Sequence, residues 1–330
     1  MAGRFNILSL SGGGFLGLYS IAVLAALEKE ANEPIARRFD LIAGTSIGGI
    51  IALGLADEIP AAEILLAFEK NGTAIFSNRP ASQGVLGLIG DLRRSLSKPK
   101  YRADALRATV ASLLGDKKIG DLKHRVMVPA VNLTKGRPQV FKTPHHQNFQ
   151  TDLHRRAVDV ALATSAAPTY FPIAEIGDAL YADGGLYANS PDLLAVHEAI
   201  HFLNQPEHAV HLLSVGTTTA QYSFAHANGR NLGLIGWVRD QRLVSAMIAS
   251  QQQSVDFMMR HRLADRYLRL DALQSKEQER HLALDVATSD AQKTIRGLAE
   301  ATVQDAIASQ QLREFLSHQA APPHFYKEAV

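Results

Sequence analysis

The sequence contains no cysteine in its 330 residues. A disulfide framework, a thiolate nucleophile, a zinc-thiolate site and a palmitoyl anchor are therefore excluded. The sequence also lacks a large net charge, because its 34 Lys and Arg residues nearly balance its 32 Asp and Glu residues and leave a formal net charge of +2. This balance gives no reason to expect a nucleic-acid polymer as a partner.

Long apolar runs are missing as well. The longest, Leu41–Ala56, is interrupted by Thr45, Ser46 and several glycines, and it falls short of the roughly 20 residues that span a bilayer. The N-terminus, MAGRFNILSLSGGG, differs from a secretory signal. We therefore expect a cytoplasmic protein that meets the inner membrane, if at all, as a peripheral protein.

Buried strands that lead through glycine turns into helices dominate the first part of the chain. The apolar run Phe5–Leu10 precedes a triglycine and the helix-period segment Gly17–Glu30, and Phe39–Ala43 similarly precedes the helix Ile50–Ala56. Further helices are expected at Pro60–Asn71, Ala103–Leu114, Leu153–Ala163 and Pro191–Leu203, and further strands at Arg125–Leu133, Gln139–Lys142, Pro172–Ile176, Leu180–Ala182 and Val210–Val215. The alternation predicts an α/β fold, a three-layer sandwich with a mostly parallel central sheet.

The domain organisation follows from the absence of repeats, low-complexity tracts and clear linkers. We expect a single domain over residues 1–330, with a catalytic core at about 5–215 and a mostly helical C-terminal extension at about 234–317. The extension includes a strand candidate at Tyr267–Leu270 and a last helix at Asp290–Leu316. Ser289 and Gln292 have the spacing of a capping box for that helix.

The segment GTSIG places Ser46 between Gly44 and Gly48. A serine in this pattern, after a strand and before a helix, is typical of a nucleophile elbow, in which the turn exposes the hydroxyl above the sheet. The alternative is a glycine-rich turn that serves close packing alone. The sequence context favours Ser46 as a nucleophile.

The triglycine Gly12, Gly13 and Gly14 follows the first expected strand. Unobstructed backbone N–H groups at a helix N-terminus favour negative charge, so the loop can serve as an oxyanion hole. Glycine-rich turns also bind nucleotide phosphates, and Gly12, Gly14 and Gly17 formally fit a dinucleotide pattern. That alternative requires an acidic residue at the end of the next strand, where Gly44 stands instead.

Asp183 precedes Gly184 and Gly185 in the sequence YADGGLY. Alone, Asp-Gly between apolar residues indicates a hairpin turn. A nucleophilic serine, however, requires a base. Histidines downstream that compete for this role are His197, His201, His208 and His211, but none lies in a glycine-bounded loop after a strand. We predict that Asp183 is the base, and that it is buried with a raised pKa because an ordinary carboxylate is a weak base.

Four blocks in this order resemble the patatin-like phospholipase family: SGGGFLG, FDLIAGTSIGGIIALGLA, ATSAAPTYFP and DGGLYANSP. The resemblance implies a patatin-like variant of the α/β-hydrolase fold. It also implies phospholipase A-type hydrolysis of membrane phospholipid esters by a Ser46–Asp183 dyad, without cofactor, metal or catalytic histidine. The segments NGTAIF and NLTKGRPQVFKTPHH are most similar to bacterial members, some of which are antiphage effectors switched on by a cyclic nucleotide.

Two rival interpretations remain open at this point. One is a constitutive lipid or ester hydrolase without an activator, and the other is a non-catalytic protein that binds a nucleotide at the triglycine. The basic, histidine-rich stretch Lys135–His146 and the C-terminal third are places where an activator could bind. A homo-oligomer is a further open alternative.

One departure from the family concerns Leu16, which stands where members usually have Arg or Lys. A cation that could assist with an anionic head group is therefore missing at this position. The apolar patch Gly84–Gly90 and the basic residues after it, Arg93, Arg94, Lys98, Lys100 and Arg102, have the composition of an interfacial segment. The alternative for this patch is a lid or a partly buried loop.

Overall fold

The computed structural model describes residues 3–76, 99–218, 233, 237 and 242–327. Its centre is an eight-stranded sheet with the strand order β5-β6-β3-β2-β1-β7-β8, in which β4 pairs with β3 outside this path. The strands are β1 (Phe5–Leu10), β2 (Leu41–Gly44), β3 (Val126–Asn132), β4 (Arg137–Lys142), β5 (Ala174–Ile176), β6 (Ala179–Asp183), β7 (Val210–Val215) and β8 (Tyr267–Leu270).

The strands β3, β2, β1, β7 and β8 run parallel, and β4, β5 and β6 pair in antiparallel fashion. Leu10 of β1 is in register with Gly44 of β2. Because both strands end at this level, the triglycine after β1 and Ser46 after β2 leave the same edge of the sheet. The carboxyl ends of parallel strands are where ligand sites of such sheets form.

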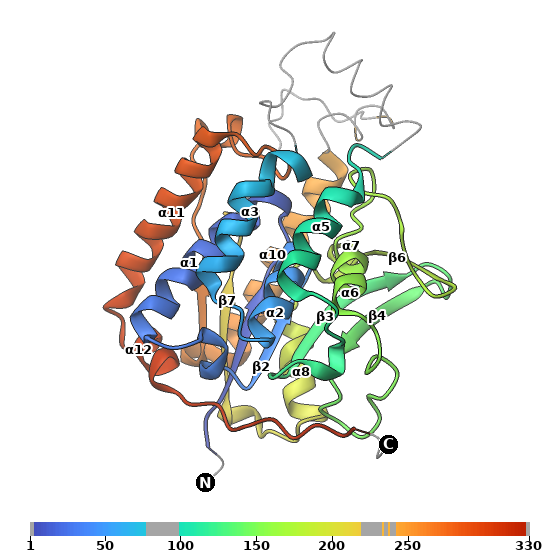
Figure 1. The fold of residues 1–330 in the computed structure, drawn as a ribbon. Helices are drawn as coiled ribbons and strands as arrows, with labels where there is room; N and C mark the ends of the chain where they lie inside the picture. Colours follow the sequence, from blue (N-terminus) through green and yellow to red (C-terminus); the bar gives the residue numbers. More distant parts are fainter. Residues whose placement is uncertain (1–2, 77–98, 219–232, 234–236, 238–241, 328–330) are drawn as a thin grey trace.

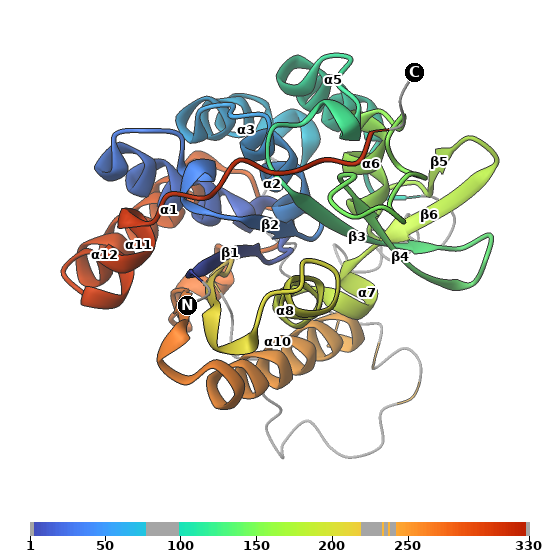
Figure 2. The same cartoon turned by 90° about the horizontal axis from the view of Figure 1, so that it is seen from below.

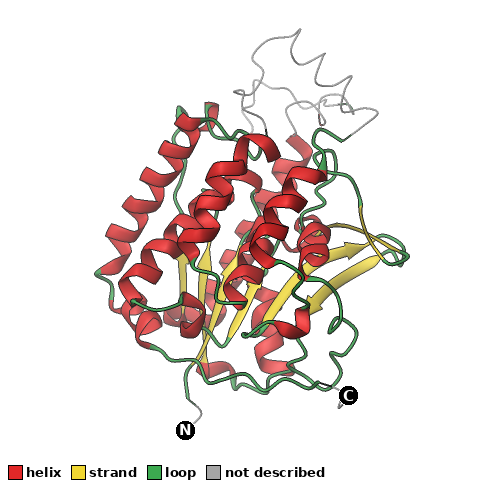
Figure 3. Cartoon of the chain, viewed as in Figure 1, coloured by secondary structure: helices red, strands yellow, loops and turns green. Residues whose placement is uncertain are grey.

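Helices cover both faces of the sheet, as Figures 1 and 2 show. One face carries α1 (Gly17–Ala31), α2 (Ile47–Ala56), α3 (Ala61–Ile75), α5 (Ala103–Leu114) and α6 (Ala157–Thr164), and the other carries α8 (Asp192–His201) and α10 (Arg242–Leu263). The short α7 (Gly185–Ala188) follows β6, and α11 (Ser289–Ile307) and α12 (Gln310–Ser317) lie beside α1. The predicted three-layer arrangement is confirmed, and Figure 3 shows its helices and strands by colour.

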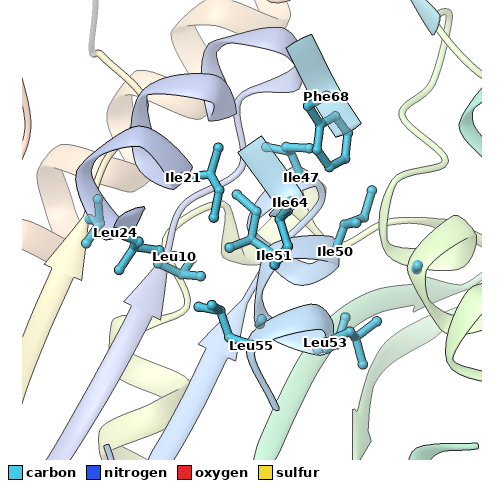
Figure 4. Close-up of a cluster of buried hydrophobic side chains, with 14 of the residues drawn as sticks. Leu10, Ile21, Leu24, Ile47, Ile50, Ile51, Leu53, Leu55, Ile64 and Phe68 are labelled. Carbon is cyan, nitrogen blue, oxygen red and sulfur yellow. The ribbon is translucent and has the colours of Figure 1, made fainter. Parts of the chain in front are cut away.

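The helix α2 is buried along its whole length. It is apolar on every side, as a helix enclosed by other elements should be. Its isoleucines and leucines pack with Leu10 of β1, Ile21 of α1 and Phe68 of α3 in the cluster that Figure 4 shows. This packing gives the turn at Ser46 a rigid support.

The last helix of the chain differs from the prediction Asp290–Leu316, because two helices, α11 and α12, occupy this range. The break falls at Ser309, whose Oγ accepts a hydrogen bond from the backbone N–H of Leu312 (3.2 Å) and caps α12. The predicted capping box is also wrong. Thr288, not Ser289, caps α11, since its Oγ1 accepts from the N–H of Ala291 at 3.2 Å.

The C-terminal extension is joined to the core by sheet pairing. The predicted strand Tyr267–Leu270 is confirmed as β8, which pairs with β7 in register from Leu212 to Val215. In addition, α11 packs along α1. These contacts support our proposal of a single domain.

Several predicted segments lie outside the described residues. They include the patch Gly84–Gly90, the basic residues Arg93, Arg94 and Lys98, and most of the first residues of the C-terminal extension, 234–236 and 238–241. Among the helices that are described, none has the length and the apolar character required to cross a bilayer.

Candidate active site

Ser46 occupies the sharp turn between β2 and α2. Its backbone has φ 56° and ψ −125°, a conformation that residues with a side chain rarely adopt. The flanking glycines permit the turn: a Cβ on Gly44 would lie 2.1 Å from the carbonyl oxygen of Gly48, and one on Gly48 would lie 2.4 Å from that of Leu10. The geometry is that of a nucleophile elbow.

Thr164, the last residue of α6, holds the backbone of this turn. Its Oγ1 accepts a hydrogen bond from the N–H of Ser46 (2.9 Å) and donates one to the carbonyl of Pro129 on β3 (2.6 Å). The sequence interpretation did not assign a role to Thr164, although the residue lies in the third family block. Its position in that block was the available signal.

Asp183 ends β6 and faces Ser46. The Ser46 hydroxyl donates a hydrogen bond to Asp183 Oδ2 at 2.6 Å, and the N–H of Gly185 donates one to Oδ1 at 2.6 Å. The predicted meeting of these two side chains is confirmed. Gly185 begins α7, so the Asp-Gly pair is not a hairpin turn. A Cβ on Gly184 would lie 2.3 Å from the carbonyl oxygen of Pro129, so this position has no room for a side chain and requires glycine.

The surroundings of Asp183 make its carboxylate a stronger base than an ordinary one. The residue is 5% exposed, and burial raises the pKa of its carboxyl from 3.8 to about 6, although the hydrogen bonds from Ser46 and Gly185 lower it in part. The predicted burial and upward pKa shift are confirmed. With this pKa the carboxyl group is mostly deprotonated at neutral pH and can accept a proton.

The four histidines that competed for the role of base lie elsewhere. In the described part of the chain, no histidine hydrogen-bonds to the side chain of Ser46 or Asp183. The rings of His197 and His201 stack on each other on α8 with centroids 4.4 Å apart. His208 lies in the turn before β7, and His211 packs against Phe315.

The triglycine loop is fixed through Gly12. The N–H of Gly12 donates to the carbonyl of Asn189 (2.9 Å), and the carbonyl of Gly12 accepts from Asn189 Nδ2 and from Thr217 Oγ1, each at 3.2 Å. The amide of Gly12 thus already donates a hydrogen bond within the protein, and in this it differs from the amides of Gly13 and Gly14. Among the described residues, the amides of Gly13 and Gly14 have no acceptor, so they are the candidates for an oxyanion hole.

A segment of the C-terminal extension also supports this loop. Gly14 has φ 55°, and a Cβ there would lie 2.2 Å from the carbonyl oxygen of Leu284. The same carbonyl accepts a hydrogen bond from the N–H of Phe15 at 2.7 Å. Asp285, the next residue, accepts from Lys100 Nζ (2.5 Å) and from the Tyr101 hydroxyl (2.7 Å). No sequence motif predicted the contact between this segment and the triglycine loop, because about 270 residues separate the two.

We expect Asp285→Ala to lower kcat for ester hydrolysis about tenfold with little change in KM, because the amides of the predicted oxyanion hole would act mainly in the transition state. Steady-state kinetics on a soluble ester measure both constants. Asp290→Ala, an exposed change on the first turn of α11, is the control and should leave kcat unchanged. An unaltered kcat in a folded Asp285→Ala protein would contradict the supporting role of this segment.

Leu16, at the position where a cation is usual, is buried in the apolar core. It lies in the single 3-10 turn Gly14–Leu16 that leads into α1. The side chain therefore contributes to packing beneath the loop. Lys100, one of the basic residues that follow the patch Gly84–Gly90, pairs with Asp285.

A cavity of about 420 Å³ opens between α5, α6 and β5. Ala166 lines it, and the carbonyl of this residue accepts the N–H of Asp183 at 3.0 Å. Its charged lining consists of Arg107, Asp159 and Glu175, and Arg107 is already paired with Asp159. An anionic ligand with two phosphates would meet a net negative wall there.

Comparison with known proteins agrees with this geometry. The family model described as patatin-like phospholipase matches residues 8–196. A protein of Pseudomonas aeruginosa named cGAMP-activated phospholipase is 40% identical over 98% of this chain and 95% of its own length. One of Vibrio cholerae with the same name is 37% identical over 87% of this chain and 86% of its own. The chain belongs to the patatin-like phospholipase family and is a hydrolase.

Among solved structures, VipD from Legionella pneumophila has a TM-score of 0.39 and 12% identity, over 91% of this chain and 67% of that one.

Proposed function

We propose that this protein is a phospholipase A-type lipid acyl hydrolase in which Ser46 is the nucleophile and Asp183 the general base. The observation that carries the proposal is the 2.6 Å hydrogen bond from the Ser46 hydroxyl to the Asp183 carboxylate. The strained turn that presents Ser46 and the burial that raises the pKa of Asp183 add to it. Membrane phospholipid is the proposed substrate.

In the first step, Asp183 accepts the Ser46 proton while Oγ attacks the ester carbonyl carbon. The amides of Gly13 and Gly14 would bind the resulting oxyanion, and one such donor is worth about 3 to 4 kcal/mol in a serine hydrolase. When the tetrahedral intermediate collapses, Asp183 returns the proton to the departing lysolipid oxygen and leaves an acyl-enzyme. Water, deprotonated by Asp183, then attacks the acyl carbon. The bond from this carbon to Ser46 Oγ breaks, Asp183 returns the proton to Oγ, and the fatty acid is released.

A cyclic nucleotide is the proposed activator. Two relatives that are 40% and 37% identical over most of the chain carry the name cGAMP-activated phospholipase, which supports the same control here. A role in antiphage defence, in which the activated enzyme degrades membrane phospholipid, extends this proposal. It would place the protein in the cytoplasm, in peripheral contact with the inner membrane.

The decisive experiment offers the purified protein a short-chain ester and, separately, phospholipid vesicles, with and without a panel of cyclic dinucleotides. Fatty-acid release that rises on addition of cGAMP supports the whole proposal. Release at the same rate without any nucleotide favours the constitutive hydrolase. No release from either substrate under any condition contradicts an acyl hydrolase.

The rate should depend on pH through Asp183. Because the base works only when it is deprotonated, and burial raises its pKa to about 6, kcat/KM should be constant above neutral pH and fall about tenfold for each pH unit below about 6. A pH profile on a soluble ester measures this. A midpoint near 4, the value of an exposed carboxylate, would show that the buried Asp183 is not the base.

A further inference from the structure

The outer face of α10 lacks charge. From Leu243 to Met258 the exposed side chains of this helix are Leu243, Val244, Met247, Ser250, Gln253, Ser254, Phe257 and Met258. Exposed helix faces in water normally carry Lys, Glu, Asp or Arg. This face instead exposes large apolar groups, with Leu243 at 46%, Met247 at 40% and Phe257 at 64%.

The exposed residues form a stripe along the helix. Leu243, Met247, Ser250, Ser254 and Phe257 follow one another at intervals of three or four residues, so they lie on one side. The residues that α10 buries against the protein lie on the opposite side: Ala249, Gln252, Met259 and Leu263. The stripe is roughly 22 Å long from Leu243 to Met258 at 1.5 Å per residue.

The stripe adjoins the short helix α7, which follows the candidate base. Gln251 of α10 donates a hydrogen bond to the carbonyl of Leu186 (3.1 Å), and its Oε1 accepts the N–H of Asn189 (3.3 Å). Leu186 belongs to α7, follows Asp183 after Gly184 and Gly185, and is itself an exposed apolar residue. Asn189 holds Gly12 of the triglycine loop. The apolar surface and the candidate active site are therefore joined through one helix and one short turn.

We propose that the uncharged stripe of α10, extended by Leu186, is the surface by which this protein docks on a phospholipid membrane. The proposal rests on the proposed acyl hydrolase function, which requires the active site to approach a bilayer. In the last turn of the helix, Arg260 pairs with Asp256 and Arg262 pairs with Glu207, and the two arginine side chains remain 62% and 35% exposed. An uncharged apolar face that ends in such exposed guanidinium groups matches a lipid surface with anionic head groups.

The test compares a variant carrying both Leu243→Ser and Met247→Ser with the parent protein, in the presence of cGAMP. Flotation with vesicles of phosphatidylethanolamine and phosphatidylglycerol measures binding, and fatty-acid release is followed on these vesicles and on a soluble short-chain ester. We expect binding and vesicle hydrolysis to fall at least about tenfold, because less apolar surface leaves water. The rate on the soluble ester should stay within about twofold, as is usual for surface changes.

Two further variants complete the design. Phe257→Ser tests the far end of the stripe and covers the case in which the first variant does not fold; it should weaken vesicle binding in the same direction. Leu66→Ser is the matched control, because Leu66 is 63% exposed on α3, on the opposite face of the sheet. It should change neither binding nor hydrolysis.

Vesicle binding that persists in folded stripe variants would overturn the proposal. So would a change from dimer to monomer, measured by light scattering, with vesicle binding intact, since the stripe would then join two copies of the chain. A failure of the acyl hydrolase proposal is recognised separately, because the parent protein would then release no fatty acid from the soluble ester. The flotation experiment would still test the docking surface, since it measures binding and not hydrolysis.

Discussion

Ser46→Ala should lower kcat for ester hydrolysis by about 10⁵-fold or more, to the residual rate that serine hydrolases show without their nucleophile. Asp183, the hydrogen-bond partner of the hydroxyl, cannot replace it, because Asp183 is the proposed base. The measurement is fatty-acid release from a short-chain ester at saturating substrate, with cGAMP present.

A conservative change on the same helix serves as the control for this result. Ile50 of α2 is buried a little further along, and Ile50→Val should cost about 1 kcal/mol of stability and leave the rate nearly unchanged. If Ser46→Ala kept a rate close to that of the parent protein, the nucleophile would have to be sought elsewhere.

Asp183→Asn should reduce kcat by about 10³- to 10⁴-fold, the scale of a lost general base. The amide has the shape of the carboxylate and can still accept the N–H of Gly185, so the fold is expected to persist. It cannot accept the Ser46 proton. The loss is measured by comparing the rates of the variant and the parent protein at pH values above 7. The rate of the variant should in addition show no dependence on pH near 6, because the titrating carboxyl group is gone.

The same variant should unfold at a higher temperature than the parent protein. Burial raises the pKa of Asp183 in the folded state above its value in the unfolded chain. Ionisation therefore favours the unfolded state and costs stability once the pH exceeds about 4, and this cost is complete above about 6. Thermal unfolding at pH 8 and pH 4 checks the sign: the advantage of Asp183→Asn should be present at pH 8 and smaller at pH 4. A less stable variant at pH 8 would contradict this account.

The sequence allowed the prediction of those parts of the site that depend on local structure. A strand that turns sharply at a serine needs small neighbours, and the five-residue motif that contains Gly44 and Gly48 meets this requirement. The alternation of buried strands and helices likewise predicted the layers and the mostly parallel sheet. The pairing of Ser46 with Asp183 followed from the requirement that a nucleophile has a base.

The contacts that support the site could not be predicted in this way. Leu284 touches the triglycine loop through its backbone carbonyl, and a backbone contact leaves no preferred residue type in the sequence. Thr164 acts through two hydrogen bonds that any buried threonine could make. The helix break at Ser309 was missed because serine is tolerated in helices as well as at their first positions.

The edge strand β8 has a consequence for any attempt to shorten the protein. The family model ends at residue 196, but a fragment cut there would lose β7 and β8 and leave β1 as an unpaired edge. It would also lack the carbonyl of Leu284 that abuts Gly14. Such a truncated polypeptide should aggregate through its open strand, so the smallest independently folding unit extends well beyond the recognised motif region.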